Sequence, residues 1–570
     1  MIYFQKLLNI LNFNEKKKLL ICYFFILIAS ILEFLSISSI IPLINLIVDT
    51  NYQTKILEHF NSSFLTDFFS EDFAAKVILI IIFVFLLKFL FLTYLSWYRA
   101  SYNEKLIVRI KNEMFSLYLN QKYIFFIKNH SSKLIRNLSN EANLFIGTIN
   151  NFISILLETS VLISLLILVY IFQPIETFVI IIIIILLGLL IYFPLKKILN
   201  KWGIIRQKND AYNIKNIQQG IGAIKDIKIN QKENFFLKQF NFTTSLSAKA
   251  GKIRGFLFDF PRLWLELVII LSVFVSLVYL LKSQNDFIDI ISTLAIYAAV
   301  GFRALPSVNR LIVAYQGLAY TKTVVNVIEE QFELKKNLSF NRSLKPIKFE
   351  KNIIIKDLSF EYENFNVFDK LNLNIKKNQC VGIIGESGSG KTTLINLISG
   401  LLEPKSGGIY IDEIELKNSK EEWLRLIGYM SQNTYIFDDT LEKNITMDDE
   451  KVDINKLNEV LNVACIKEIF DRSKLDYAYN LGEYGSKLSL GQIQRIGIAR
   501  ALYQNPSILI LDEATSALDL ETEEKLIDNL IKYCNLYNIT TILVSHRKKP
   551  LVNCDLVFSI ETGKTISNDE

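Results

Sequence analysis

Apolar residues in the first 320 positions gather in six stretches, each long enough to cross a bilayer. A membrane-spanning helix needs about 20 predominantly apolar residues. The stretches lie near 19–47, 76–98, 152–172, 175–195, 262–282 and 287–320. This pattern predicts six transmembrane helices. The long segments after the second and fourth stretches are predicted to continue as helical extensions outside the membrane.

The charged residues between these stretches predict an orientation. Residues 99–150 hold eight Lys or Arg, and residues 196–261 are similarly rich in them. Residues 49–75 hold Lys55 alone against five acidic residues. Because loops rich in Lys and Arg stay in the cytoplasm, we expect both termini and the two long segments to be cytoplasmic. The chain is then a multi-pass protein of a cytoplasmic (inner) membrane.

Two short amphipathic segments flank the first stretch. The N-terminal "MIYFQKLLNILNF" places its apolar residues on one helical face with lysines beside it, which predicts an interfacial helix. The segment "ILEHFNSSFLTDFF" predicts a short external amphipathic helix near residues 55–69.

The pattern changes after residue 330. Residues 331–348 are mostly polar and are interpreted as a linker, and in residues 349–570 apolar strands alternate with helical patterns. That alternation is typical of an α/β domain. The sequence therefore predicts an α-helical transmembrane domain at 1–330, a linker, and a soluble α/β domain at 349–570.

Composition excludes some classes of protein and ligand. The 570 residues are 51% hydrophobic with a formal net charge of +6, and the mean hydropathy is +0.29. This modest surplus contains no long basic tail, so we expect no nucleic-acid partner. The five cysteines lack CxxC spacing, which supports neither a zinc site nor a disulfide framework. We expect them to be buried, reduced thiols.

A glycine-rich segment, "GIIGESGSGKTTL", joins a predicted strand to a predicted helix and fits the pattern GxxxxGK[ST]. Its glycines allow backbone N–H groups to surround phosphate, and the helix N-terminus adds a positive end. Lys391 is expected to reach the β- and γ-phosphates of ATP, while Thr392 coordinates Mg²⁺. The expected ATP-binding residues in this loop are Gly385, Glu386, Ser387, Gly388, Ser389, Gly390, Lys391, Thr392 and Thr393.

A second segment, "SILILDEATSALD", reads as a buried strand that ends in two acids, Asp512 and Glu513. Burying adjacent carboxylates without a partner is costly. We expect Asp512 to hold Mg²⁺ through water and Glu513 to polarise the attacking water.

With these motifs the chain resembles the ATP-binding cassette (ABC) transporters. Between the two motifs lies "KLSLGQIQRIGIARAL", similar to that family's signature sequence, and "GYMSQN" and "ILVSHR" follow the family's order. The resemblance implies that Tyr362 stacks on adenine, that Gln432 couples the metal to the membrane helices, and that His546 contacts the γ-phosphate.

The resemblance also implies a division of roles among these positions. Ser489, Gly491 and Gln492 of the signature are expected to contact ATP held by another copy. The expected catalytic residues are Glu513, His546 and Gln432, and the expected Mg²⁺ ligands are Thr392, Gln432 and Asp512. Because the chain has one P-loop and one signature, it is interpreted as half of a transporter. A homodimer is the simplest completion, and a heterodimer is the alternative.

The signature departs from the usual LSGGQ, because Leu490 stands at its third position. Glycine permits close backbone approach to a ligand, so a leucine there predicts a displaced nucleotide, a slower turnover, or a specialised half of a heterodimer. With Glu513 and His546 intact, we expect an active site with an altered rate.

Four cationic residues lie in or beside the apolar stretches, where a charge costs roughly 2.5–3.5 kcal/mol on insertion scales. They are Lys88, Arg262, Arg303 and Arg310. One interpretation is structural pairing, of Arg262 with Glu266 and of Lys88 with Glu33. The other is a cationic cavity for a phosphate headgroup, since arginine matches phosphate oxygens with two parallel hydrogen bonds.

The neighbourhood "FRALPSVNRLIVAYQGLAY" is also similar to bacterial lipid-linked oligosaccharide flippases of protein glycosylation. The leading hypothesis is therefore an ATP-driven flippase for an anionic polyprenyl-pyrophosphate-linked oligosaccharide, with membrane lipids around it. The alternatives are export of another lipid such as lipid A, of a peptide or of a drug, and a nucleotide-gated channel or sensor. Six spans exclude a soluble DNA-repair ATPase.

Overall fold

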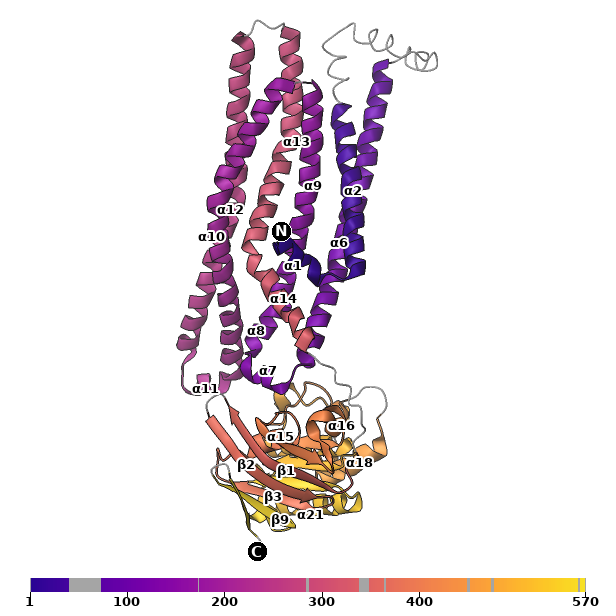
Figure 1. The fold of residues 1–570 in the computed structure, drawn as a ribbon, viewed down its shortest axis with the longest axis vertical. Helices are drawn as coiled ribbons and strands as arrows, with labels where there is room; N and C mark the ends of the chain where they lie inside the picture. Colours follow the sequence, from indigo (N-terminus) through magenta and orange to yellow (C-terminus); the bar gives the residue numbers. More distant parts are fainter. Residues whose placement is uncertain are drawn as a thin grey trace. The chain divides into compact units, whose positions relative to one another are not determined.

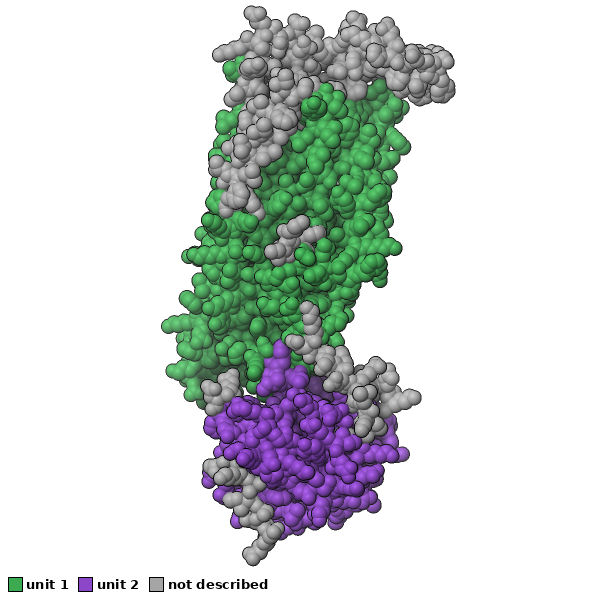
Figure 2. Space-filling view, viewed as in Figure 1, with its two compact units in different colours: residues 1–121, 126–338 green, residues 122–125, 339–570 purple. Residues whose placement is uncertain are grey.

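The computed structural model of the chain divides into two compact units, residues 1–121 with 126–338 and residues 122–125 with 339–570 (Figure 2). The structure describes residues 2–39, 73–172, 174–282, 287–337, 348–362, 365–447, 452–472, 476–561 and 564–568.

Unit 1 is helical, and long helices run side by side along it (Figure 1). Its elements are α1 (Ile2–Ile10), α2 (Phe13–Ser38), α6 (Phe73–Leu119), α8 (Ser131–Arg136), the π-helical turn η1 (Asn137–Glu141), α9 (Ala142–Phe172), α10 (Pro174–Gly222), α11 (Ile224–Ile229), α12 (Glu233–Lys282), α13 (Phe287–Tyr320) and α14 (Lys322–Asn337). The short helix α7 (Tyr123–Lys128) begins in the segment 122–125, which is assigned to unit 2. The last five predicted apolar stretches each lie within one long helix. The first begins in α2, and its residues 40–47 lie outside the described residues.

Several of these helices have the length and composition of membrane spans. Among the described residues, Phe13–Ser38, Ala75–Leu119 and Ser131–Ile171 qualify, and Gly301–Tyr320 with Lys322–Lys335 qualifies as a pair bent by 50°. The predicted spans at 175–195 and 262–282 fall in α10 and α12, where many side chains lie outside the described residues. The helical transmembrane region is therefore present, and the number of six crossings stays a prediction.

The amphipathic N-terminal segment forms α1, whose Leu7 and Ile10 are buried, as is Leu11 directly after it. Lys6 Nζ lies 2.6 Å from the Glu329 carboxylate on α14. Protein rather than lipid covers this part of the predicted membrane-facing surface, and an interfacial position for the helix stays a prediction. The external helix predicted near residues 55–69 lies outside the described residues.

The predicted linker at 331–348 requires a correction, because helix α14 continues to Asn337. Its apolar Val324, Val325 and Ile328 are fully buried, and Gln331 is buried with its side chain accepting a 2.9 Å hydrogen bond from the Tyr118 hydroxyl. The segment looked like a linker because the exposed face of this amphipathic helix is polar. The compact units divide between residues 338 and 339.

Unit 2 is built on two sheets, with strand orders β2-β1-β4-β5 and β10-β9-β3-β8-β7-β6. The strands are β1 (Asn352–Tyr362), β2 (Phe365–Lys376), β3 (Cys380–Gly385), β4 (Ser406–Ile411), β5 (Ile414–Glu415), β6 (Ile427–Met430), β7 (Ile508–Asp512), β8 (Thr540–Ser545), β9 (Leu556–Glu561) and β10 (Lys564–Asn568). The helices are α15 (Lys391–Ile398), α16 (Lys420–Arg425), α17 (Leu441–Thr446), α18 (Ile454–Val463), α19 (Lys467–Arg472), α20 (Leu490–Tyr503) and α21 (Leu520–Leu536), with short 3₁₀ turns η2 (Leu416–Asn418), η3 (Glu483–Gly485) and η4 (Lys549–Leu551).

The larger sheet positions the predicted motifs. Strands β9, β3, β8, β7 and β6 run parallel to one another, β10 pairs antiparallel with β9, and every residue of β7 and β8 is buried. Buried parallel strands carry continuous apolar runs, which explains "ILIL" in β7 and "ILV" in β8. The loops after β3, β6, β7 and β8 leave the carboxyl edge of this sheet, where α/β proteins bind ligands. The predicted α/β domain is confirmed.

Close helix packing in unit 1 depends on glycine. A Cβ atom added at Gly203 on α10 would lie 2.3 Å from the backbone carbonyl oxygen of Tyr320 on α13. Small residues let helices approach closely in membrane proteins. At Gly220, on the same helix, an added Cβ would meet nothing within 4 Å.

We expect Gly203→Ala to destabilise unit 1 by about 1–3 kcal/mol, because the methyl group must push α10 and α13 apart. Thermal unfolding of the detergent-purified chain measures the effect, with Gly220→Ala as the matched control. The control should be neutral or slightly stabilising, since alanine favours helix. Equal unfolding temperatures for the two variants would contradict this packing.

Candidate functional site

The predicted phosphate loop is a tight turn between β3 and α15. Gly388 and Gly390 have positive φ angles of 85° and 103°, which glycine adopts at little cost. A Cβ atom at Gly390 would lie 2.9 Å from Val367 Cγ1, and one at Gly385 would lie 2.6 Å from Ser389 Oγ. The turn therefore requires these glycines, and it ends at the N-terminus of α15, where a phosphate would be favoured.

Lys391 begins α15 and folds back over this loop. Its Nζ donates to the carbonyl oxygens of Gly385 at 2.7 Å and Glu386 at 2.8 Å. An ammonium group carries three N–H donors, so one remains for an anion. Ser389 Oγ is buried in the same loop and has no hydrogen-bond partner among the described residues. Both groups fit a phosphate ligand.

Asp512 ends β7 and is 2% exposed. Burial raises the pKa of its carboxyl group and the neighbouring Glu513 charge raises it further, while the Thr392 hydroxyl and Lys391 oppose the shift. Asp512 Oδ2 has no hydrogen-bond partner in the described part of the chain. A cation here would stabilise the ionised form. One carboxylate, the Thr392 hydroxyl and the Gln432 amide oxygen make a donor set that suits a Mg²⁺ ion shared with phosphates.

The three residues predicted to be catalytic meet at the carboxyl edge of the sheet. Gln432 Nε2 donates to Glu513 Oε2 at 2.7 Å, and His546 Nδ1 lies 3.9 Å from Glu513 Oε1. They follow β6, β7 and β8, so adjacent parallel strands bring them together. Glu513 has a positive φ of 51°, an uncommon backbone conformation that recurs at functional sites.

The signature segment forms the start of α20. Ser489 is its N-cap: Ser489 Oγ accepts from the Gln492 backbone N–H at 3.3 Å, and Gln492 Oε1 accepts from the Ser489 backbone N–H at 2.8 Å. Gly491 is buried, and a Cβ atom there would lie 2.9 Å from Leu518 Cδ2. Leu490 is 64% exposed. Its side chain therefore points away from the domain core, and it can contact a ligand or protein that binds at the start of α20.

Tyr362 lies at the end of β1 and is partly buried. Its ring packs edge-on against Phe360, with the centroids 4.9 Å apart. Adenine stacking by Tyr362 stays a prediction.

Gln494 is a residue that sequence reasoning missed. Its side chain is buried in α20, where Nε2 donates to Ser516 Oγ at 2.9 Å and Oε1 accepts from the Ala517 backbone N–H at 3.2 Å. It ties the signature helix to the loop that follows Glu513. The available signal was a glutamine on the side of α20 whose other residues are apolar or glycine, within "GQIQR".

In unit 1 the buried carboxylate of Glu33 contacts two of the four cationic residues predicted to line a substrate cavity, Lys88 and Arg303. Glu33 on α2 is 1% exposed, accepts a hydrogen bond from Arg303 Nε on α13, and lies 3.0 Å from Lys88 Nζ on α6. Lys88 also donates to Ser36 Oγ at 3.0 Å. The predicted Lys88–Glu33 pair is confirmed, and Arg303 joins it.

The other two cations have separate partners. Arg310 binds the buried Glu158 of α9, through Nε to Oε1 at 2.5 Å and Nη2 to Oε2 at 3.2 Å. Arg262 Nε lies 2.9 Å from Glu266 Oε1 one turn along α12, as the pairing interpretation predicted, and the Arg262 side chain is 64% exposed. Arg262 therefore stands apart from the Glu33 cluster.

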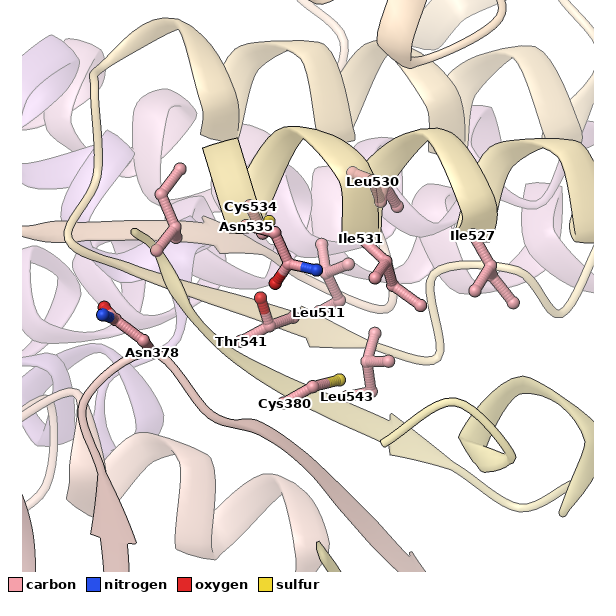
Figure 3. A pocket seen from close by; sticks show the side chains of 11 residues that line it. Asn378, Cys380, Leu511, Ile527, Leu530, Ile531, Cys534, Asn535, Thr541 and Leu543 are labelled. Atoms are coloured by element: carbon pink, nitrogen blue, oxygen red, sulfur yellow. The ribbon is translucent and has the colours of Figure 1, made fainter. Parts of the chain in front are cut away.

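A small cavity in unit 2 lies between α21 and the larger sheet (Figure 3). Its volume is about 20 Å³, and Cys380, Cys534 and Leu543 are among its lining residues. None of the phosphate-loop residues lines it, so it is not the nucleotide site. Burial raises the pKa of the Cys534 thiol to about 11, as expected of a buried thiol. Cys380 and Cys554 are only partly buried, with sulfurs 3.1 Å apart.

Comparison with known families agrees with this geometry. Residues 368–516 match the ABC transporter family, and residues 19–305 match the ABC transporter transmembrane region. The chain belongs to the ABC transporter family. The match spans the phosphate loop, the signature and the Asp512–Glu513 pair, so this ABC transporter is an ATP-dependent transport enzyme, as the sequence predicted.

Relatives of this ABC transporter include exporters and flippases. It is 27% identical over 494 residues to an ATP-dependent lipid A-core flippase of Francisella tularensis (strain SCHU S4 / Schu 4), covering 83% of this chain and 78% of the relative. It is 28% identical over 486 residues to ABC transporter B family member 1 of Dictyostelium discoideum, and there it spans 82% of this chain but only about half, 52%, of the relative.

The fold is also that of a solved exporter. A bacterial Atm1-family ABC exporter with ATP bound superposes with a TM-score of 0.78 at 16% identity, covering 96% of this chain and 94% of that one. This likeness confirms the predicted fold class, a helical transmembrane domain followed by an α/β nucleotide-binding domain.

Replacing Glu513 with Gln should leave ATP binding nearly intact and cut hydrolysis by about 10²–10⁴-fold, the usual contribution of a positioned general base. Nucleotide binding and phosphate release by the purified chain measure the two effects. Glu524→Gln, which removes a surface carboxylate paired with Lys549, is the matched control and should hydrolyse ATP normally. Wild-type turnover by Glu513→Gln would refute the assignment.

Leu490→Gly should keep or raise the ATPase rate, because the exposed leucine would obstruct a nucleotide that approaches the start of α20. Leu536→Gly, which removes an exposed leucine at the end of α21, controls for loss of apolar surface. A fall of more than about tenfold, equivalent to about 1.4 kcal/mol, would show instead that the leucine is a required contact.

Proposed function

We propose that this ABC transporter is an ATP-driven flippase that works as a homodimer in a bacterial inner membrane, with both termini in the cytoplasm. Its proposed substrate is an anionic lipid, a polyprenyl-pyrophosphate-linked oligosaccharide. The observation that carries this proposal is the charge cluster formed by Glu33, Lys88 and Arg303 in the helical unit.

The cluster has more positive than negative charge. Lys88 and Arg303 share one carboxylate, Glu33, so one positive charge is left without a counter-ion inside the cluster. A buried charge without a partner is costly, and a ligand phosphate would supply the missing negative charge. Arg303 uses Nε for Glu33, which leaves the guanidinium edge that forms paired hydrogen bonds with phosphate oxygens.

Arg310 and Arg262 lie outside the Glu33 cluster, and each would have a different role in the proposed function. Arg310 and Glu158 balance one another, with two hydrogen bonds between them. Arg310 therefore contributes to an anion site only if a ligand displaces Glu158. Arg262 is exposed beside Glu266 and would meet the substrate at the edge of a pathway rather than in the Glu33 cluster.

A lipid A-like substrate is the second candidate, and the lipid A-core flippases among the relatives favour it. Both lipids would present phosphate to the same cations, so they differ in carrier and glycan rather than in headgroup charge. Export of a peptide or a drug receives no support from a cluster with surplus positive charge. A nucleotide-gated channel would not require the Gln432–Glu513 hydrogen bond that places a base for hydrolysis.

The proposed energy source is MgATP. The phosphate loop and Lys391 would bind the phosphates, and Thr392, Asp512 and Gln432 would hold Mg²⁺, which neutralises charge on the transferred phosphoryl group. Glu513 would accept a proton from the attacking water, and His546 would contact the γ-phosphate. Ser489, Gly491 and Gln492 would face the ATP of the second copy.

Arg303→Gln should lower translocation of a pyrophosphate-linked lipid in proteoliposomes by about 10–100-fold, since a lost charge-assisted hydrogen bond costs roughly 1.5–3 kcal/mol. Folding and basal ATPase activity should persist, because Lys88 still neutralises Glu33. Arg303→Lys should recover part of the activity, since it restores the charge without the planar fork.

Two controls distinguish a loss of substrate binding from a loss of folding. Arg310→Gln alone orphans the buried Glu158 and should destabilise the protein, whereas Arg310→Gln with Glu158→Gln keeps a neutral pair and should fold. Lys201→Gln with Lys225→Gln removes two exposed charges and should translocate normally. Full translocation of the pyrophosphate lipid by well-folded Arg303→Gln, or equal translocation of the same lipid without its pyrophosphate, would rule out the proposed headgroup site.

A further inference from the structure

A pocket of about 120 Å³ lies between the first turns of α2 and the middle of α6, which pack side by side in unit 1 (Figure 1). Its lining residues are Glu15, Lys18, Tyr98, Ser101, Tyr102, Lys105 and Leu106. It contains none of the residues assigned to ATP or to the transported substrate.

The pocket is positively charged. Its one lining carboxylate, Glu15, is held by Arg109, with Nε 2.8 Å from Oε1 and Nη2 2.7 Å from Oε2. Lys18 and Lys105 are exposed at its mouth and form no ion pair with any described residue. Two lysines therefore face the pocket with no internal counter-ion, while its acid is already neutralised.

The pocket also offers hydroxyl groups. The Ser101 hydroxyl makes no hydrogen bond with a described residue, and the Tyr102 hydroxyl has only a long 3.5 Å bond to the Glu15 carbonyl oxygen. The Tyr98 hydroxyl donates to the Lys18 carbonyl oxygen at 3.2 Å, which fixes α2 against α6 at this level. Hydroxyls beside two ammonium groups suit the oxygens of a phosphate ester.

Aromatic residues place this level at a membrane surface. Tyr94 and Trp97 of α6 are exposed, and Phe25 of α2 packs edge-on against Tyr94 and Tyr98, with centroids 5.7 and 5.4 Å apart. Tyrosine and tryptophan gather where the hydrocarbon core meets the lipid headgroups. From here the apolar stretch 76–98 runs one way and the positively charged segment 99–150 runs the other.

Exposed apolar surface adjoins the pocket on the hydrocarbon side. Leu20 and Phe24 of α2 and Leu90 of α6 are each more than half exposed within unit 1. A lipid whose phosphate reached the two lysines could lay its acyl chains along this surface. A soluble phosphate would gain nothing from it.

We propose that this pocket binds the phosphodiester of an anionic phospholipid from the membrane leaflet on the side of the N-terminus. Lys18 and Lys105 pair with the phosphate, Ser101 and Tyr102 donate hydrogen bonds to its oxygens, and the acyl chains cover the apolar faces of α2 and α6. Basic pockets between membrane helices on the cytoplasmic side bind such headgroups. The site is separate from the substrate pathway and from the proposed function.

The test is a native mass-spectrometry titration of the detergent-purified full chain with phosphatidylglycerol and, in parallel, phosphatidylcholine of the same acyl chains. We expect the wild type to prefer phosphatidylglycerol by at least about tenfold. Each lysine near an anionic headgroup contributes a factor of about five, the equivalent of roughly 1 kcal/mol. Lys18→Gln with Lys105→Gln should therefore weaken phosphatidylglycerol binding by about 30-fold and leave phosphatidylcholine unchanged.

Lys232→Gln with Lys238→Gln removes two exposed lysines at the start of α12 and serves as the matched control. If the paired Lys18 and Lys105 variant does not fold, the single variants should each lose about fivefold. Phosphatidylglycerol binding that matches the control variant would overturn the proposal. Inorganic phosphate that displaces the lipid at equal concentration would also overturn it, because the site would then recognise a free anion rather than a lipid.

Discussion

A carboxylate buried among apolar helices must be paired with a positive charge. In the helical unit this requirement applies to Glu33 and Glu158, and it restricts how the helices can pack. Both are almost completely shielded from solvent. Their partners come from other helices: Lys88 on α6 and Arg303 on α13 for Glu33, and Arg310 on α13 for Glu158. Breaking such a pair by removing one member costs about 3–5 kcal/mol. These contacts therefore fix how α2, α6, α9 and α13 pass one another.

The ion pairs of Glu33 hold helices together and also position the cations that we propose to bind the substrate. In the proposed function, Glu33 holds Lys88 and Arg303 in place while a headgroup binds the charge that Glu33 leaves over. The carboxylate and the headgroup would then compete electrostatically for the same two cations. A balanced pair such as Arg310–Glu158 is better suited to holding helices together. The surplus positive charge at Lys88 and Arg303 is the reason that we propose an anion site there rather than a purely structural ion pair. In the nucleotide-binding domain the buried carboxyl group of Asp512 lacks positive charge instead. Its Oδ2 has no hydrogen-bond partner among the described residues and its pKa is raised, which suits a cation.

The sequence predicted what depends on local pattern. Long apolar runs became long helices, and the P-loop and the buried strand before Asp512 formed as expected because strand, turn and helix signals are close together. It also predicted the Arg262–Glu266 and Lys88–Glu33 pairs. It did not predict that Arg303 joins Glu33 or that Arg310 takes Glu158, since helix packing decides which of several charges meet across 270 or 152 residues of chain.

Other features depended on tertiary contacts in the same way. Residues 331–337 were predicted to be a linker because their sequence is mostly polar, but they continue α14, whose apolar face is buried against other helices. The apolar face of α1, expected to meet lipid, includes residues covered by protein. Gln494 was overlooked because its role is to hold Ser516 and Ala517, a contact that no motif spacing reveals.

The most direct test of the central claim is the affinity of the full chain in phosphatidylcholine nanodiscs for a short-chain polyprenyl pyrophosphate, compared between wild type and Glu33→Gln. If Glu33 competes with the substrate for Lys88 and Arg303, its neutral replacement should bind the pyrophosphate at least about tenfold more tightly, a gain of about 1.4 kcal/mol. If Glu33→Gln stays folded and binds the pyrophosphate no better than the wild type, the cluster only holds helices together, and the claim that it recognises an anionic headgroup is wrong.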